Sequence, residues 1–189
     1  MPRLSAALDR IQPSQTLAMT ARVADLQRQG VDVIGLSAGE PDFDTPDFVK
    51  EAAIAAIRAG RTKYTQVDGT PELKAAIAAK FRRDNGLDFA PSQISVNVGG
   101  KHTIFNAIVA TCEAGDEVVI PAPYWVSYPD IVAYAGATPV VIAAGADQDY
   151  KITPDQLDRA ITPRTRWVLL NSPSNPSGAA YSAAELTAL

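Results

Sequence analysis

The tripeptide Gly99, Gly100 and Lys101 stands between an apolar stretch and a helical pattern. The stretch ISVNV at 94–98 predicts a strand, and the helical pattern covers 101–115. A strand, a glycine turn and a helix N-terminus bring backbone N–H groups and the positive end of the helix dipole to one point. Such a point suits a phosphate group, but Gly-Gly-Lys alone is a weak signal that a plain tight turn explains equally well.

Two known phosphate-binding patterns do not fit this stretch. A P-loop has the pattern Gly-x-x-x-x-Gly-Lys-Ser/Thr. Here Ser95 occupies the position of the first glycine, and His102 occupies that of the hydroxyl residue. The dinucleotide pattern Gly-x-Gly-x-x-Gly follows none of the predicted strands. A P-loop-like nucleotide-binding domain therefore stays a minor alternative.

An aromatic ring and an amide follow two later strands. Trp125 lies in PAPYWVSYP, and Asn175 lies in NSPSNPSGAAY. Because parallel strands end at the same edge of a sheet, we expect Trp125, Asn175 and Gly-Gly-Lys to share that edge, where ligands bind. A tryptophan there either covers the core or stacks on a flat ring. The three features together suit a planar phosphorylated cofactor better than a nucleoside triphosphate.

Other reactive side chains favour structural roles. Cys112, in NAIVATCEAG, is predicted to be a buried thiol and not a nucleophile, since no histidine is available to activate it. His102 is the single histidine and is expected to be a solvated helix residue. The acidic residues of GEPDFD at 39–44 resemble a solvated turn, so we expect no metal site.

The composition is that of a folded, mildly acidic chain. The 189 residues are 47% hydrophobic and carry a net charge of −4. The 17 basic residues are dispersed, which argues against nucleic-acid binding. No apolar run has the length of a signal peptide or a membrane helix. We therefore expect no membrane association and a cytoplasmic location.

The N-terminal part predicts three helices and one strand. A helix is expected at 14–30 with Ser14 as its N-cap, and VDVIGLSAG at 31–39 reads as a short buried strand. The next two helices, at 45–60 and 70–86, each begin with Thr-Pro. This pair supplies an N-cap and a first helical residue.

From residue 94 onward, strands and helices alternate. Strands are expected at 94–98, 117–123, 138–144 and 166–173, and helices at 101–115, 125–136, 153–161 and from 182. Thr153 with Gln156 and Ser182 with Glu185 form capping boxes for the last two helices. This alternation predicts an α/β fold in which a mostly parallel sheet is flanked by helices, after a helical N-terminal segment.

Five motifs together resemble one known family. In chain order they are LSAGEPDFDTP, KYTQVDGTPELKAAIA, VGGKHTIFNA, PAPYWVSYP and NSPSNPSGAAYS. Their order and spacing resemble the N-terminal half of class I aminotransferases, the fold-type I enzymes that use pyridoxal 5′-phosphate. The bacterial aspartate aminotransferases, including those that accept prephenate, are the most similar branch. The resemblance implies amino-group transfer between an acidic amino acid, aspartate or glutamate, and a 2-oxo acid by a homodimer.

The resemblance also implies cofactor-binding residues. Gly99, Gly100 and Lys101 match the loop and helix start that hold the cofactor phosphate. Trp125 resembles the aromatic residue that stacks on the pyridine ring, and Asn175 resembles the amide that hydrogen-bonds the phenolic oxygen of the ring.

Further roles follow from the same likeness. Tyr64 resembles a tyrosine that reaches the phosphate in the neighbouring subunit, and Tyr128 is expected behind the ring. Gly39 resembles the glycine whose backbone meets the substrate α-carboxylate. Lys101 is expected to contact the distal carboxylate, and Trp125 and Asn175 also border the substrate. Ala122–Pro123 and Asn175–Pro176 are candidates for cis peptide bonds.

By this likeness no catalytic residue lies in the chain, because the Schiff-base lysine, the aspartate at the pyridine nitrogen and the carboxylate-binding arginine are expected beyond Leu189. The segment SAAELTAL has no helix terminator, so the chain is expected to stop in mid-helix as the N-terminal portion of a longer protein. We expect 1–45 to contribute to a small domain and 46–189 to form an incomplete cofactor-binding domain. Alone, the chain is expected to be inactive, and an interaction module or inactive fragment is the main alternative.

Overall fold

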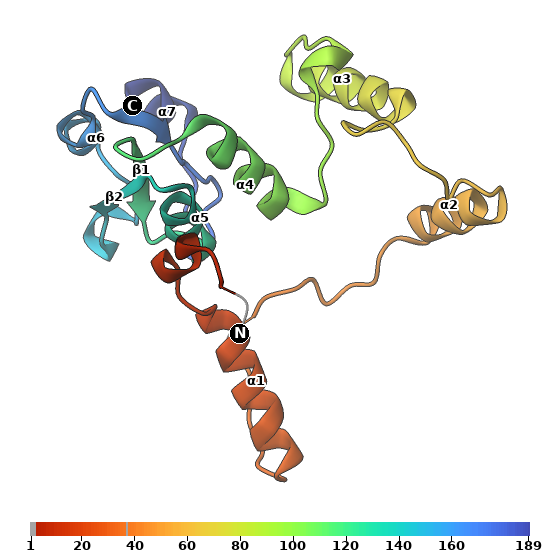
Figure 1. Cartoon of the computed structure of the whole chain (residues 1–189), viewed down its shortest axis with the longest axis horizontal. Helices are drawn as coiled ribbons and strands as arrows, with labels where there is room; N and C mark the ends of the chain where they lie inside the picture. The colour runs from red at the N-terminus through yellow and green to blue at the C-terminus, as the bar shows by residue number, and fades with distance from the viewer. Residues whose placement is uncertain (1–2, 37) are drawn as a thin grey trace. The chain divides into compact units, whose positions relative to one another are not determined.

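The computed structural model describes residues 3–36 and 38–189 (Figure 1). Two compact units divide the chain. One comprises residues 34–103, which we call the helical unit, and the other combines the N-terminal segment up to Val33 with 104–189, which we call the sheet unit.

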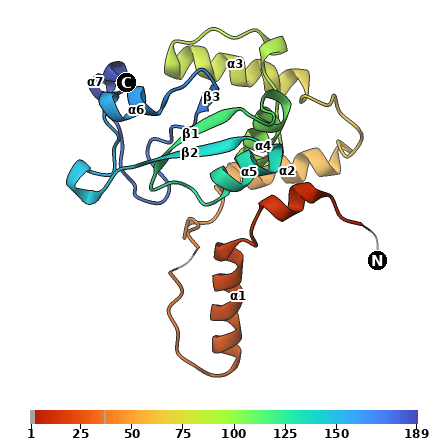
Figure 2. The same cartoon turned by 60° about the vertical axis from the view of Figure 1, so that its left-hand side comes forward.

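The sheet unit is built around three parallel strands. They are β1 (Glu117–Ala122), β2 (Thr138–Ala143) and β3 (Thr165–Val168), in the order β2-β1-β3. Figure 2 shows β1 beside β2. The predicted parallel sheet of an α/β fold is confirmed.

Strand β1 is buried on both faces because hydrophobic clusters lie on each side of it. Val118 and Ile120 belong to a cluster with Ile108, Cys112, Tyr128, Ile131, Val132 and Ala137. Val119 belongs to a second cluster with Ile142, Ala144, Ile152 and Leu157. Alternate residues of a strand point to opposite faces, so neighbouring valines enter different clusters. A strand covered on both faces accounts for the uninterrupted apolar run VVIPA at 118–122.

Short helices connect and follow the strands. Helix α5 (Ser127–Ala135) links β1 to β2, and the 3₁₀ helix η3 (Ala146–Gln148) and helix α6 (Pro154–Ala160) link β2 to β3. Helix α7 (Ala183–Ala188) follows β3. The predicted capping boxes of α6 and α7 are both confirmed.

The N-terminal segment of the sheet unit contains the 3₁₀ helix η1 (Ala6–Arg10), which packs against α5, and helix α1 (Gln15–Arg28). Ser14 caps α1 as predicted, since its Oγ accepts from the N–H of Leu17 at 3.4 Å. No residue of α1 is buried.

The helical unit contains α2 (Asp47–Arg58), α3 (Pro71–Asn85), the 3₁₀ helix η2 (Pro91–Gln93) and the start of α4 (Gly99–Thr111). Thr70 caps α3 as predicted, because its Oγ1 accepts from the N–H of Leu73 at 3.3 Å. Gly86 ends this helix in the left-handed conformation, with φ at 66°.

Two of the predicted strands are wrong. Residues 31–36 and 38–39 form no strand, and Ile34 and Leu36 expose 84% and 92% of their surface. The segment 94–98 is not a strand either: the N–H of Val96 bonds to the carbonyl of Asp68 at 3.0 Å. An apolar run becomes a strand only where another strand supplies hydrogen bonds, and neither segment has such a neighbour in the described residues.

Some element boundaries also differ from the prediction. Pro46, and not Thr45, is the N-cap residue of α2, and no side chain caps that helix. Helix α4 begins at Gly99, so both glycines lie inside its first turn. Strand β3 ends at Val168, although the N–H of Leu169 still bonds to the carbonyl of Val119 at 2.9 Å.

No helix within 3–36 or 38–189 is long and apolar enough to cross a bilayer. The division into 1–45 and 46–189 concerns the complete protein and stays a prediction.

Candidate functional site

The two loops that carry Trp125 and Asn175 lie at one edge of the sheet. Strands β1 and β3 are adjacent and parallel, so the segments that follow them leave the same edge. The Oγ of Ser174 lies 3.5 Å from the carbonyl oxygen of Pro123, which joins the two loops. The predicted shared edge is confirmed for this pair of loops.

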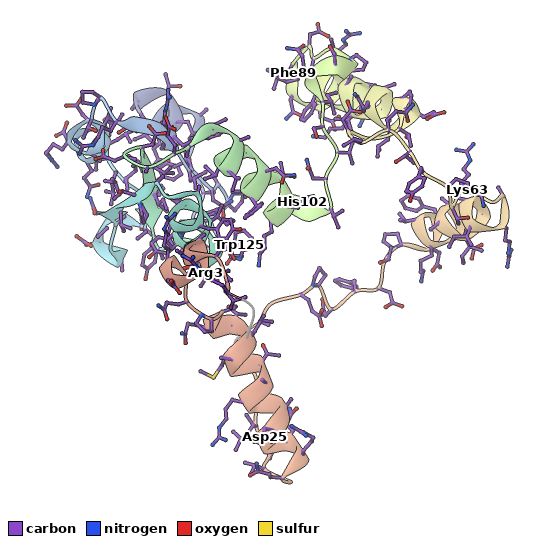
Figure 3. The ribbon with its side chains drawn as sticks, viewed as in Figure 1. Arg3, Asp25, Lys63, Phe89, His102 and Trp125 are labelled. Carbon is purple, nitrogen blue, oxygen red and sulfur yellow. The ribbon has the colours of Figure 1, made fainter. Side chains whose placement is uncertain are left out.

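Trp125 is held by its neighbours in the first loop. Its ring meets that of Tyr128 edge-to-face, with centroids 5.4 Å apart and planes at 86°. The N–H of Tyr128 also donates to the carbonyl of Trp125 at 3.0 Å. Tyr128 is buried, and burial raises the pKa of its hydroxyl. Figure 3 labels Trp125 among the packed side chains of the sheet unit, where it covers the cluster that contains Tyr128.

Cis peptide bonds occur in both loops. The predicted cis bonds Ala122–Pro123 and Asn175–Pro176 are confirmed, and Ser172–Pro173 is also cis. Sequence reasoning missed the third bond, although a second X-Pro pair in the same short loop was the available signal.

Asn175 is held through its main chain by a side chain that sequence reasoning also missed. The Oδ1 of Asn171 accepts from the N–H of Asn175 at 2.9 Å, and its Nδ2 donates to the carbonyl of Pro173 at 3.1 Å. The exposed Asn175 side chain therefore stands on a loop that is hydrogen-bonded at its base.

The end of this loop is fastened to the segment before α6. The Oγ of Ser172 accepts from the N–H of Tyr181 at 3.0 Å, and the Oη of Tyr181 accepts from the N–H of Ile152 at 2.8 Å. Lys151 pairs with Glu185 at 2.6 Å. This hydrogen bond, with the cap bonds from Ser182, lowers the pKa of Glu185 to about 2.

A small cavity lies between the two loops. Its lining is dominated by proline and tyrosine and consists of Pro121, Pro123, Tyr124, Tyr128, Tyr150, Leu169, Leu170, Asn171, Ser174 and Tyr181. Most of these side chains are partly buried, so the edge that carries Trp125 and Asn175 is supported from behind.

The Gly-Gly-Lys tripeptide forms the first turn of α4. Gly99 has φ at 81°, a conformation that favours glycine, and a Cβ at Gly100 would meet nothing within 4 Å. The first turn of α4 contains no acidic residue, unlike those of α2, α3, α5, α6 and α7. His102 is exposed, as predicted, and its Nδ1 accepts from the N–H of Val98 at 3.3 Å.

The remaining predicted residues lie in exposed segments of the helical unit. Gly39 is the last residue of the mispredicted strand, and Tyr64 is fully exposed in the connection between α2 and α3. Their roles, and those of the other cofactor and substrate residues, stay predictions.

Cys112 is buried, as predicted, and burial raises the pKa of its thiol. The described part of the chain contains no group of three His, Cys, Asp or Glu residues arranged to hold a metal ion.

The family model for "Aminotransferase class I and II" matches residues 31–189. The aspartate/prephenate aminotransferase of Cereibacter sphaeroides is 62% identical over 100% of this chain and 47% of that protein. The protein of the same name from Nitrosomonas europaea is 58% identical over 99% of this chain and 47% of its own length.

Solved structures agree with these relatives. Aspartate aminotransferase from Rhizobium meliloti superposes with a TM-score of 0.94 at 53% identity, over 99% of this chain and 47% of that one. Aspartate aminotransferase from Thermus thermophilus with maleate gives a TM-score of 0.95 at 47% identity, over 100% of this chain and 49% of that one. The chain thus spans about half the length of the proteins that it matches.

Proposed function

The chain belongs to the aminotransferase class I and II family, and on that premise we propose that it is the N-terminal part of an enzyme that moves an amino group between aspartate or glutamate and a 2-oxo acid. The family uses pyridoxal 5′-phosphate. The observation that carries the proposal is the pairing of Trp125 and Asn175 at one sheet edge within a segment that matches the family.

The residues at this edge fit the ring of that cofactor. Trp125 offers an aromatic surface held in place by Tyr128, and Asn175 offers an amide donor on a fastened loop. A flat ring with a phenolic oxygen needs these two kinds of group. When bound, pyridoxal phosphate supplies the electron sink of the reaction, and these side chains orient its ring.

The first turn of α4 fits the phosphate. The first N–H groups of a helix have no acceptor within the helix, and the helix dipole favours an anion there. Gly99 and Gly100 leave the backbone open to approach, and no acidic side chain of that turn opposes the anion. We assign the phosphate to Gly99, Gly100 and Lys101.

A substrate with two carboxylates accounts for the remaining assignments. We place its α-carboxylate at the backbone of Gly39 and its distal carboxylate at Lys101, with Trp125 and Asn175 alongside. The support comes from relatives whose names include aspartate and prephenate and from a solved relative described with maleate. Aspartate, prephenate and maleate are all dicarboxylates.

Two broader features complete the proposal. The enzyme is a homodimer in which Tyr64 reaches the phosphate of the partner site, and the full exposure of Tyr64 is compatible with that role. Its location is the cytoplasm.

Two measurements test the proposed function. In the first, pyridoxal phosphate is titrated into this chain and into the variants Trp125→Ala and Asn175→Ala, and binding is followed by the absorbance of the cofactor. Each substitution is expected to weaken binding by roughly tenfold, the loss of about one stacking contact or one hydrogen bond. Excess MgATP is expected not to displace the cofactor, whereas displacement would favour the nucleotide-binding alternative.

In the second measurement, residues 1–189 are joined to the C-terminal part of the Cereibacter sphaeroides relative. We expect the hybrid protein to transfer the amino group of aspartate to 2-oxoglutarate, and this chain alone to show no transfer. A folded hybrid that binds pyridoxal phosphate but does not transfer the amino group of aspartate or glutamate would contradict the substrate assignment.

A further inference from the structure

We propose that Asn171 is a positioning residue, which fixes the loop that presents Asn175 and thereby sets the affinity for the cofactor ring. The inference rests on the proposed function, because it takes Asn175 to contact the ring. Asn171 itself is assigned no contact with the cofactor.

The position of Asn171 ties the loop to the sheet. The N–H of Leu169 is still hydrogen-bonded to Val119 in the central strand, and Asn171 follows two residues later. Its side chain is partly buried in the wall of the cavity between the two loops. A side chain at this position can therefore hold residues 173–175 in a fixed position relative to the sheet.

The loop needs a side chain for this purpose because two of its residues have no main-chain donor. Pro173 and Pro176 have no N–H group, so few main-chain hydrogen bonds are available to shape the segment around Asn175. The Asn171 amide accepts from the N–H of Asn175 at 2.9 Å and donates to the carbonyl of Pro173 at 3.1 Å. The Asn171 amide therefore satisfies one main-chain donor and one main-chain acceptor, which belong to the residues on either side of Ser174.

The far side of the loop closes on itself. The N–H of Gly178 donates to the carbonyl of Ser174, and the N–H of Ser174 donates to the carbonyl of Ala179, both at 2.8 Å. Asn175 lies inside this closed turn. Among the hydrogen bonds described for Asn175, the one to Asn171 is the only one that connects its main chain to the sheet.

Asparagine is the side chain that this geometry requires. An amide can accept and donate at the same time, whereas a carboxylate can only accept and would face the Pro173 carbonyl without a proton to share. Asn171→Asp therefore keeps the bond from the Asn175 N–H and loses the other. Asn171→Ala loses both.

The first experiment measures amide hydrogen exchange by NMR in this chain without cofactor. The variants are Asn171→Ala and Asn171→Asp, with Asn85→Ala as a matched control that removes a surface hydrogen bond at the end of α3. We expect Asn171→Ala to reduce the protection of the Asn175 N–H by at least tenfold and Asn171→Asp to retain most of it. The amides of β1 report whether the fold is intact and are expected to be unchanged.

The second experiment titrates the same variants with pyridoxal phosphate. We expect the dissociation constant to rise about tenfold in Asn171→Ala, about threefold in Asn171→Asp and not at all in Asn85→Ala.

The outcomes separate the two proposals. Unchanged protection of Asn175 in Asn171→Ala overturns the positioning role, as does unchanged affinity in that variant when Asn175→Ala binds more weakly. If Asn175→Ala binds the cofactor normally, the proposed cofactor contact fails, and the exchange data still decide whether Asn171 holds the loop.

Discussion

Helix α5 of the sheet unit and helix α2 of the helical unit differ in how far they are buried. In the sheet unit, α5 buries Tyr128, Ile131 and Val132, whereas α2 in the helical unit buries no residue. Phe48 and Ile57 of α2 expose 78% and 64% of their surface. A sheet supplies two faces on which amphipathic helices can pack, and the helical unit contains no strand in its described residues.

This difference indicates where stability is generated within the chain. The edge that carries Trp125 and Asn175 is supported by its own core. Phe48 and Ile57 of α2 gain little from burial, because that energy depends on the area removed from water.

The largest expected effect comes from emptying the core of the sheet unit. Ile120→Ala removes a side chain that is fully buried and should lower the free energy of unfolding by about 2–5 kcal/mol. Ile57→Ala is the matched substitution in α2 and should change it by less than about 0.5 kcal/mol. Urea denaturation followed by circular dichroism measures both. Similar losses in the two variants would show that α2 is packed.

A smaller effect is expected from a glycine in the helical unit. Gly69 has φ at 108°, and a Cβ there would lie 2.6 Å from Cγ2 of Val96. Backbone strain in Gly69→Ala should therefore lower the free energy of unfolding by about 1–3 kcal/mol, and the clash with Val96 should lower it further. The control is Gly60→Ala, because Gly60 has φ at 71° but open space around it. This substitution should lower the free energy of unfolding by about 1 kcal/mol. Equal thermal shifts for the two variants would mean that the Val96 side chain moves aside freely.

The Glu185–Lys151 pair predicts a dependence of stability on pH in the sheet unit. The pKa of Glu185 is lowered from 4.5 to about 2. The stability from its carboxylate is therefore fully present above pH 4.5 and is lost as the pH falls toward 2. Glu185→Gln should flatten this part of the profile of melting temperature against pH. An unaltered profile would assign the acid sensitivity to other carboxylates.

The smallest effect is expected for a surface ion pair of the helical unit. Arg82 pairs with Asp88, and both side chains are about three-quarters exposed. Arg82→Ala should change the free energy of unfolding by less than about 1 kcal/mol because solvent screens exposed pairs. The same urea titration measures this change, and a loss as large as that of Gly69→Ala would show that the pair is not screened.

The sequence predicted the elements whose signals are local. Thr70, Thr153 and Ser182 mark helix starts because an N-cap acts within its own first turn. The strands around Val119 and Val140 were also predicted, since each reads as an apolar run, and β1 is the buried parallel strand that such a run indicates. The strand predicted at 31–39 is absent at 31–36 and 38–39, because an apolar run does not reveal whether a strand lies beside it.

The candidate site was predictable to the same extent. The shared edge of the Trp125 and Asn175 loops follows from the rule for parallel strands. The role of Asn171 was not predictable, because the direction of a side-chain amide depends on which main-chain groups the folded loop leaves without a partner. Gly39 and Tyr64 are exposed, and their assignments rest on the family alone.

The alternation of side chains along β1 has a consequence for the cooperativity of unfolding. Val118 and Val119 are adjacent in the chain but belong to different hydrophobic clusters. If either cluster unfolded, one face of β1 would be exposed to solvent. The other cluster would then lose the ordered strand on which it packs. The sheet unit should therefore unfold in a single two-state transition, with the same midpoint when it is followed by tryptophan fluorescence and by the NMR signals of the β1 amides.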